Sequence, residues 1–282
     1  RVDIWGAAAS IVLDSPSLAR LIDPLSGVLQ QEIGVDAVFV HGRPGDDDQP
    51  VDWSRVPLGQ IAGARPASDL VVKERGVRVA VRPWDGPDAG LFNDMRDVRA
   101  WLEPHWSGKR VLNTFAYTGM FSLVAALNRA EAVTTVDLSP HYLERARANF
   151  VLNDLDPSAH DWMVSDTFKA LDALRRKGEL FDVVIADPPS FSHSDAGTWS
   201  VAAGLGRLVS SCLRVLAPGG WLVVATNLGT MSPKEFRKHV LKGSHKARRP
   251  LRLVHEGSTP VDFPASLDFP ESRYLKCWIL QA

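Results

Sequence analysis

The sequence has little cysteine, no long apolar run and almost no net charge, and each absence narrows what the chain can be. Its 282 residues include two cysteines, Cys212 and Cys277, far apart and in apolar surroundings. This usage indicates a reducing cytoplasm, offers neither a disulfide framework nor a zinc motif, and predicts two small core side chains. No apolar run approaches the roughly 18–20 residues of a membrane helix. The first residues, Arg1–Trp5, lack the layout of a signal peptide, and because the chain does not begin with Met we expect residues upstream of Arg1.

The net charge of −1 argues against a protein that holds nucleic acid by bulk charge alone. The charge is unevenly spread, because Glu235 is the one acid within a basic stretch from Lys234 to Arg252. This stretch is either a solvated helix face and loop or a contact for an anionic partner. Its basic members are Lys234, Arg237, Lys238, Lys242, Lys246, Arg248, Arg249 and Arg252.

From Lys109 onward, apolar runs of strand length alternate with helical segments. Strands rich in Val, Ile and Leu that alternate with helices indicate a parallel sheet covered on both faces. The sequence therefore predicts an α/β fold. The expected strands are Arg110–Phe115, Ala132–Asp137, Trp162–Asp166, Phe181–Asp187 and Trp221–Asn227. The expected helices begin near Thr118 and cover Pro140–Leu152, Phe168–Lys177 and a segment near Ala202–Leu216.

Residues 1–83 predict a separate, small α+β domain. Ile11–Leu13 and Ala37–Val40 are expected as strands around a helix over Pro16–Ile33, and Asp69–Lys73 and Val77–Val81 as a hairpin. Residues 84–108 are the expected linker to a main domain over residues 109–282. The acidic segment Gly42–Gln49 is expected as an exposed loop.

Four of the expected strands end on a polar residue: Asp137, Asp166, Asp187 and Asn227. In open α/β sheets, ligands bind outside the carboxyl ends of the strands. One such residue could arise by chance, whereas four successive ones indicate a ligand site at that edge. Asp166, with Thr167 and Phe168 beside it, is placed to meet an amino group of an adenine.

The segment Asn113–Gly119 joins the first strand of the main domain to its helix. A glycine in front of a helix lets the backbone approach a ligand, and the helix N-terminus favours an anionic group. The segment is not G-x-G-x-x-G, so it lacks a dinucleotide fingerprint. Asp137, which ends the next strand, could accept both hydroxyls of a ribose. Alternatively, it could cap the helix that begins at Ser139-Pro140.

The run Asp187-Pro188-Pro189-Ser190-Phe191 is the most specific motif in the chain. Two prolines stiffen the turn and remove two N–H donors, so carbonyl groups are left to face a ligand. The Asp187 carboxylate can hold an N–H-bearing base edge, and Phe191 can stack on a base. The alternative is an ordinary proline-rich turn.

These motifs resemble the bacterial 23S ribosomal RNA methyltransferases that form 5-methylcytosine or 7-methylguanine. The likeness covers Phe115–Gly119, Thr135–Ser139 and Asp187–Ser192, together with Gly90–Arg96 and Tyr274–Trp278. It implies a Rossmann-like class I fold with a seven-stranded, mostly parallel sheet and S-adenosylmethionine as cofactor. It also implies contacts between the cofactor and Phe115, Tyr117, Gly119, Asp137, Asp166 and Asp187, with Asp94 and Arg96 near its methionine end. Their neighbours Asn113, Thr118, Leu138, Ser139 and Thr167 are further candidate contacts.

Asn227 separates the two product types. Cytosine C5 needs a thiolate that adds at C6, and the 5-methylcytosine members carry that cysteine just after the fifth strand. Here Asn227 stands in its place, and Cys212 and Cys277 lie elsewhere. Guanine N7 has a lone pair in the ring plane, so positioning suffices. The candidate catalytic residues are Asp187, Pro188, Phe191 and Asn227, with guanine N7 as the preferred target.

The resemblance also bears on partners. It favours the basic stretch as a contact for large-subunit ribosomal RNA, and His193, Trp199 and Arg207 as possible lining of the substrate cleft. Family members commonly begin with a small RNA-binding module that is not visible here. Near-neutral charge leaves open a methyltransferase for another RNA base, a small molecule or a protein, or a non-catalytic RNA-binding protein of the same fold. No metal or membrane partner is expected, and the oligomeric state cannot be deduced from the sequence.

Overall fold

The computed structural model describes residues 1–43, 51–194, 197–269 and 272–282. The chain divides into two units, Arg1–Phe92 and Asn93–Ala282, and their boundary lies within the expected linker over residues 84–108. Each unit has its own sheet. Residues 44–49 of the expected acidic loop lie outside the described residues.

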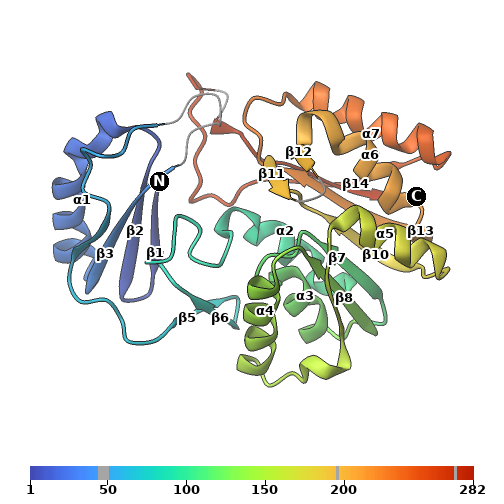
Figure 1. Ribbon diagram of the computed structural model, residues 1–282, viewed down its shortest axis with the longest axis horizontal. Coiled ribbons are helices and arrows are strands. Elements are labelled where there is room, and N and C mark those ends of the chain that lie inside the picture. The colour runs from blue at the N-terminus through green and yellow to red at the C-terminus, as the bar shows by residue number, and fades with distance from the viewer. Residues whose placement is uncertain (44–50, 195–196, 270–271) are drawn as a thin grey trace. The chain divides into compact units, whose positions relative to one another are not determined.

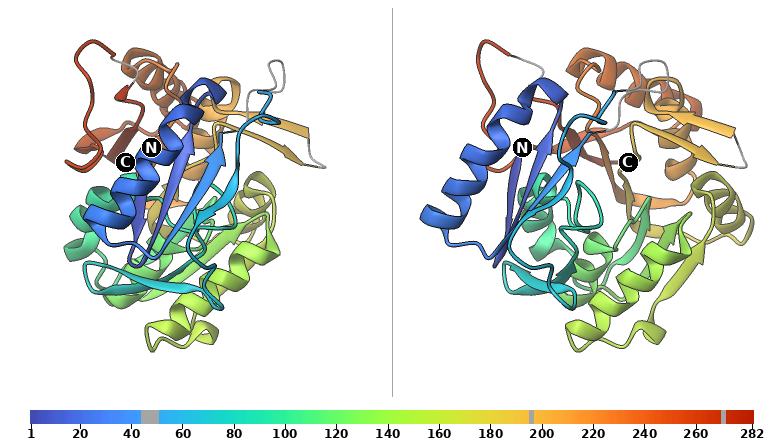
Figure 2. Two further views of the ribbon diagram at one scale, coloured as in Figure 1. Left: turned by 90° about the vertical axis from the view of Figure 1, so that its left-hand side faces the viewer. Right: turned by 60° about the vertical axis from the view of Figure 1, so that its left-hand side comes forward.

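The described part of the first unit is built on a four-stranded sheet in the order β1-β2-β3-β4. Strands β2 and β3 are parallel and the outer pairings are antiparallel. The chain between β2 and β3 is helical and lies along one face of the sheet (Figure 2), where Ile22 and Leu29 pack on Ile11 and Val38. The strands are β1 (Val2–Trp5), β2 (Ala8–Leu13), β3 (Ala37–Gly42) and β4 (Gly59–Ala62). The helical stretch comprises a 3-10 turn (Pro16–Leu21), α1 (Ile22–Val28) and a π turn (Leu29–Ile33).

The predicted hairpin is confirmed as β5 (Leu70–Glu74) and β6 (Val77–Val81), which pair in antiparallel fashion. Its two turn residues, Arg75 and Gly76, have φ angles of 49° and 90°. Positive φ at both central positions suits the twist of a two-residue hairpin.

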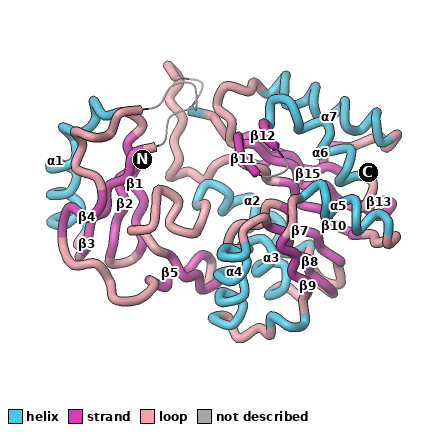
Figure 3. The backbone as a smooth tube through the Cα atoms, viewed as in Figure 1, coloured by secondary structure: helices cyan, strands magenta, loops and turns pink. Residues whose placement is uncertain are grey.

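The described part of the second unit contains a seven-stranded sheet in the order β14-β15-β13-β10-β7-β8-β9. Among these strands β15 runs against its neighbours β13 and β14, and the other pairings are parallel. The expected α/β alternation is therefore confirmed (Figure 1, Figure 3). The strands are β7 (Arg110–Thr114), β8 (Ala132–Asp137), β9 (Asp161–Val164), β10 (Phe181–Ala186), β13 (Leu216–Thr226), β14 (Arg252–Gly257) and β15 (Lys276–Gln281). The helices are α2 (Arg96–Leu102), α3 (Met120–Leu127), α4 (Pro140–Leu152), α5 (Thr167–Arg176), α6 (Val201–Leu213) and α7 (Pro233–Ala247).

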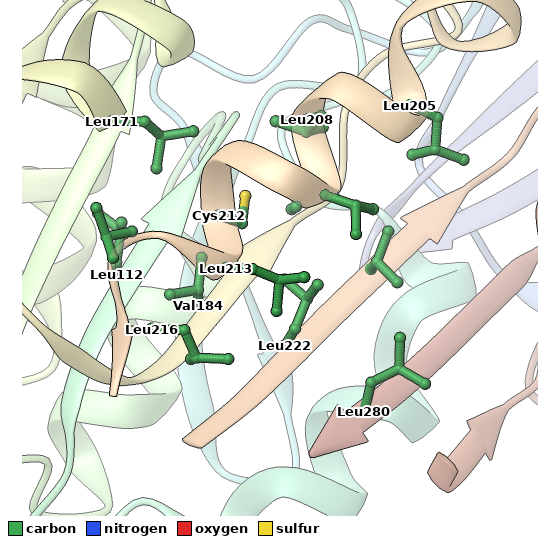
Figure 4. Close-up of a cluster of buried hydrophobic side chains, with 14 of the residues drawn as sticks. Leu112, Leu171, Val184, Leu205, Leu208, Cys212, Leu213, Leu216, Leu222 and Leu280 are labelled. Carbon is green, nitrogen blue, oxygen red and sulfur yellow. The ribbon is translucent and has the colours of Figure 1, made fainter. Parts of the chain in front are cut away.

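The two faces of this sheet carry different cores. Leu112 and Val184 point to the face covered by α5, α6 and α7, where they join a large buried apolar cluster (Figure 4). The neighbouring residue Asn113 points to the opposite face because side chains alternate along a strand. There its amide contacts Ser122 of α3.

Helices α6 and α7 approach each other closely at two glycines. A Cβ at Gly243 would lie 2.6 Å from the Val209 side chain and 2.7 Å from the Gly206 carbonyl oxygen. Phe236 and Val240 of α7 are buried against the same cluster. The close approach therefore depends on the missing side chain.

Some details differ from the sequence-based expectation, among them strands β1, β4 and β14, which were not predicted. Helix α6 ends at Leu213, and Leu216 already begins β13, where it pairs with Phe181 of β10. A short hairpin, β11 (Phe191–Ser194) and β12 (Gly197–Ser200), follows the Pro-Pro turn and was not predicted.

None of the helices in the described ranges is long and apolar enough to cross a membrane.

The α6–α7 contact gives a stability prediction. Gly243→Ala should lower the free energy of unfolding by about 1–3 kcal/mol, because overpacking at a helix contact outweighs the gain in helix propensity. Gly27→Ala in α1 is the matched control, since a Cβ there meets nothing within 4 Å, and it should raise stability by about 0.5–1 kcal/mol. Chemical denaturation measures both. A Gly243→Ala protein as stable as the wild type would contradict the packing argument.

Candidate active site at the carboxyl edge of the sheet

The carboxyl ends of β7, β8, β10 and β13 meet at one edge of the second unit's sheet, since these strands are parallel. Asp137 is the last residue of β8, Asp187 directly follows β10, and Asn227 directly follows β13. Asp166 lies two residues beyond the end of β9. The four predicted strand-end residues are thus brought to one edge of the sheet.

The Asp137 carboxylate connects the end of β8 to the turn after β7. Its Oδ2 accepts the Tyr117 N–H at 2.8 Å and its Oδ1 accepts the Ser139 N–H at 2.9 Å. Burial raises the pKa of Asp137, and the backbone N–H donors of Ser139, Tyr117 and Leu138 oppose that shift. Asp137 does not cap α4, because Ser139 is the capping residue and accepts the Tyr142 N–H.

The turn after β7 holds three residues in the left-handed region: Phe115, Tyr117 and Gly119, with φ angles of 54°, 52° and 75°. The first two carry side chains, and such residues cost of order 1–3 kcal/mol each and cluster at functional sites. A Cβ at Gly119 would lie 2.7 Å from the Ala146 Cβ. Glycine is therefore required there for both its φ angle and its contact with α4.

Asn113 lies in β7 just before this turn, and Thr118 belongs to the turn itself. The buried Asn113 amide donates to Ser122, which also accepts from Thr135. Thr118 is buried, and its carbonyl accepts from Asn149 at 3.3 Å. Both predicted residues are therefore buried, and their hydrogen bonds support the turn.

The loops after β8 and β9 carry three further candidate cofactor contacts, Leu138, Asp166 and Thr167. Asp166 caps α5, with its Oδ1 accepting the Lys169 N–H at 3.0 Å. Thr167, the first residue of α5, is buried, whereas Leu138 is half exposed. The Ser165 N–H donates to the Asp137 carbonyl at 2.9 Å, so the ends of β8 and β9 are held together.

Asp187 lies in a group of charged side chains. Burial and the neighbouring Asp94 together raise its pKa to about 7, against the opposing effect of Arg99. Asp94 and Arg99 are themselves buried, and Asp94 accepts a hydrogen bond from the Tyr274 hydroxyl at 2.9 Å. A carboxyl group that titrates near neutral pH beside a second carboxyl marks a functional site.

Arg96, predicted near the cofactor, is engaged with another side chain. Its guanidinium donates to both oxygens of Asp262, at 3.2 Å and 2.6 Å. The fork-shaped pair joins the start of α2 to the loop before β15. Arg96 therefore links α2 to this loop.

Asn227 and the Pro-Pro turn are hydrogen-bonded to each other. The Ser190 hydroxyl donates to the Asn227 Oδ1 at 2.9 Å. The Lys276 ammonium donates to the Leu228 carbonyl at 2.6 Å, and burial lowers the pKa of Lys276. The loop after β13 is therefore fixed on two sides.

Aromatic side chains surround the same turn. Pro188 is buried, while Phe191 is 54% exposed. Trp199 donates from its indole to the Pro189 carbonyl at 3.0 Å and contacts Phe115 and Phe168. Arg207 stacks over Phe168 at 4.3 Å. Trp199 and Arg207 thus lie around the turn, and the side chain of His193 lies outside the described residues.

Neither cysteine is exposed at the candidate site. Both are fully buried. Burial raises the pKa of Cys212 to about 12 and also raises the pKa of Cys277.

Within the described ranges no group of three or more His, Cys, Asp or Glu side chains could hold a metal ion.

Several site residues were missed from the sequence. Ser190, Tyr274 and Lys276 each form a hydrogen bond with a predicted residue or its loop, and the charge of Arg99 acts on Asp187. Tyr274 and Lys276 alternate along the approach to β15, which is a pattern of one strand face, but their partners are 180 and 48 positions away. Such long-range contacts leave no local signal.

Residues 60–274 match the model of the family described as S-adenosylmethionine-dependent methyltransferase. The chain is 37% identical over 224 residues to ribosomal RNA large subunit methyltransferase I of Aeromonas salmonicida, covering 79% of the chain and 57% of that relative. It is 35% identical over 237 residues to the Shewanella denitrificans protein of the same name, covering 84% of the chain and 60% of the relative. The chain thus spans less than two thirds of the length of these relatives.

The fold matches solved structures of the same kind. SMU.776, proposed to be a methyltransferase and solved with SAH, superposes with a TM-score of 0.90 at 26% identity, over 100% of this chain and 71% of that one. The match includes the seven-stranded sheet and the small sheet of the first unit. By its matching residues and its fold, this chain belongs to the S-adenosylmethionine-dependent methyltransferase family.

Proposed function

We propose that the chain transfers a methyl group from S-adenosylmethionine to a base of large-subunit ribosomal RNA, and that the acceptor atom is guanine N7. The names of its relatives support the RNA substrate. The guanine assignment depends on one observation: the Ser190–Asn227 hydrogen bond stands where a 5-methylcytosine enzyme needs a thiol.

The residues at the strand ends fit the cofactor. The partly buried Asp137 carboxylate suits the hydroxyls of a ribose, and the left-handed turn of Phe115, Tyr117 and Gly119 brings backbone to the same edge. Asp187 and Asp94 offer negative charge to the positive methionine end. Thr118, Leu138, Ser139, Asp166 and Thr167 border the same edge, and Arg96 and Asn113 support it.

When bound, S-adenosylmethionine supplies an electrophilic methyl group on a sulfonium. The chain's own contribution is to hold and orient the base. Phe191, exposed beside the Pro-Pro turn, offers a face for stacking, and Pro188 and Pro189 keep that turn stiff. A lone pair at guanine N7 needs neither a general base nor a covalent adduct, so positioning supplies the rate enhancement.

The Asn227 amide specifies what kind of base edge it meets. Its oxygen accepts the Ser190 hydroxyl, so its NH₂ group remains to donate. Guanine presents O6, an acceptor, next to N7 on its major-groove edge. A donor at Asn227 therefore suits guanine O6 and holds N7 toward the cofactor.

The proposal is tested with methyl-labelled S-adenosylmethionine and unmodified ribosomal RNA, followed by nucleoside digestion and mass spectrometry. The expected product is labelled 7-methylguanosine in large-subunit RNA, lost in Asp187→Ala. A different methylated nucleoside would overturn the guanine assignment. Label found only in a small molecule or a protein would overturn the RNA substrate.

The pKa of Asp187 predicts how cofactor affinity depends on pH. Because the pKa is raised to about 7, the carboxyl is mostly neutral below that pH and mostly negative above it. A positive ligand binds the ionised form better, so affinity should rise about tenfold between about pH 6 and about pH 8. Asp187→Asn should abolish this dependence and keep the weaker affinity throughout.

Calorimetric titration with S-adenosylmethionine measures this effect. Asp172→Asn on the exposed face of α5 is the control, because salt bridges with Arg175 and Arg176 lower the pKa of Asp172. It should preserve the wild-type dependence. Equal affinities of the wild type at the two pH values would show that Asp187 does not face the positive end of the cofactor.

Removal of the Asn227 amide should weaken catalysis on RNA and leave the affinity for the cofactor unchanged. Asn227→Ala is expected to lower kcat/KM for RNA by roughly 10–200-fold, since one good base contact is worth about 1–3 kcal/mol. The Kd for S-adenosylmethionine should stay unchanged. Ser190→Ala, which frees the amide to rotate, should cost less than Asn227→Ala, and the opposite order would contradict the assigned role of the amide.

A further inference from the structure

Helix α7 carries a row of lysines on the side that faces away from the protein core. Lys234, Lys238, Lys242 and Lys246 follow one another at four-residue spacing and are all exposed. Residues four apart are neighbours on a helix, so the four side chains form one ridge that winds by about 120° around the helix over its length. Exposed Arg237 and Arg248 flank this lysine row.

The lysine row is opposed by one acid of its own helix, Glu235, whose carboxyl group feels the charge of Lys238. None of the six basic residues forms an ion pair within the part of the chain that the structure describes. The acid of this helix, Glu235, closes the capping box with Ser232. Like charges four apart destabilise a helix by about 0.2–0.5 kcal/mol per pair. A row that weakens its own helix indicates a partner that supplies negative charge.

A neighbouring histidine lies in the same positive field. Burial lowers the pKa of His239 on α7, and the nearby Lys242 and Lys238 lower it further, while Glu235 opposes them. The helix is nevertheless well anchored, since Phe236 and Val240 are buried against α6. The positive charge is therefore presented on a rigid support.

Not every member of the basic stretch contributes to this surface. The guanidinium of Arg249 donates to the carbonyls of Leu213 and Ala217, at 2.8 Å and 2.9 Å, and to that of Leu216. Arg249 therefore completes the end of α6. Although Arg249 belongs to the basic stretch, we do not include it in the lysine row or its flanks.

The lysine row begins close to the candidate active site. The loop that leads into α7 starts at Asn227 and is fixed by the Lys276–Leu228 and Met231–Leu228 hydrogen bonds. From Lys234 the row extends along the helix for about 18 Å, at a rise of about 1.5 Å per residue. A strand whose base enters at Asn227 could continue along it.

We propose that the lysine row binds the phosphate backbone of the RNA strand that carries the target base. The identity of the polyanion as RNA rests on the proposed function. An anionic membrane suits the helix less well, because interfacial helices insert an apolar face, whereas the apolar face of α7 is buried on α6. The row contributes affinity and places the strand, and the strand-end residues perform the chemistry.

The test compares two triple variants of equal charge. Lys238→Gln, Lys242→Gln and Lys246→Gln together remove most of the row. Lys73→Gln, Lys109→Gln and Lys177→Gln, all exposed and outside α7, form the matched control. The Kd for an unmodified large-subunit ribosomal RNA fragment is measured over a range of salt concentrations, and the Kd for S-adenosylmethionine is measured as a check of folding.

The row variant should bind the RNA at least about tenfold more weakly, and its salt slope should fall by about 2, since each lost phosphate contact on a single strand removes about 0.7. The control variant should match the wild type. If the row variant still methylates RNA and binds it with wild-type affinity and salt slope, the proposed role of the lysine row is wrong and the proposed function stands. A wild type that neither binds nor methylates RNA would overturn the proposed function. If the wild type binds vesicles of anionic lipid but not RNA, and the row variant loses the vesicle binding, the partner of the lysine row is a membrane and not RNA.

Discussion

The two hydrogen bonds that the Asp137 carboxylate accepts from the Tyr117 and Ser139 backbones are the contact around which the candidate site is arranged. They hold the turn after β7 against the end of β8 and so stabilise a backbone with Phe115 and Tyr117 in the left-handed region. A carboxylate that accepts backbone N–H groups also keeps those donors satisfied where water is scarce. Under the proposed function, the same carboxylate meets a ribose without any rearrangement of the turn.

The end of the chain supplies the second support. Because β15 returns antiparallel between β13 and β14, the residues at its start lie near the carboxyl ends of the parallel strands. Tyr274 holds Asp94, and Lys276 holds the Leu228 carbonyl. The charged group around Asp187 and the loop that carries Asn227 are thus fixed by a segment far away in the sequence. Positioning of this kind is what a reaction without an acid–base or covalent step requires.

Local pattern predicted the five parallel strands of the second unit, their order of appearance and the polar residues at four of their ends, because alternation and strand length are properties of short segments. It did not predict β1, β4 or β14. It could not predict which side chains would meet. The Ser190–Asn227 bond joins residues 37 positions apart, and Arg249 was counted as part of a charged surface although its donors are used by carbonyls of α6 and β13. The hairpin β11–β12 was missed because Phe191–Ser200 lacks the alternation of a buried strand.

The most direct test of the account asks whether catalysis passes through a covalent adduct with the base. RNA in which every cytidine is replaced by 5-fluorocytidine would trap a thiol-dependent enzyme, since fluorine at C5 cannot leave as a proton does. Methyl transfer to this RNA should proceed at the rate seen with unsubstituted RNA, and no enzyme–RNA complex should survive denaturation. A denaturation-resistant complex together with loss of methyl transfer would contradict this expectation.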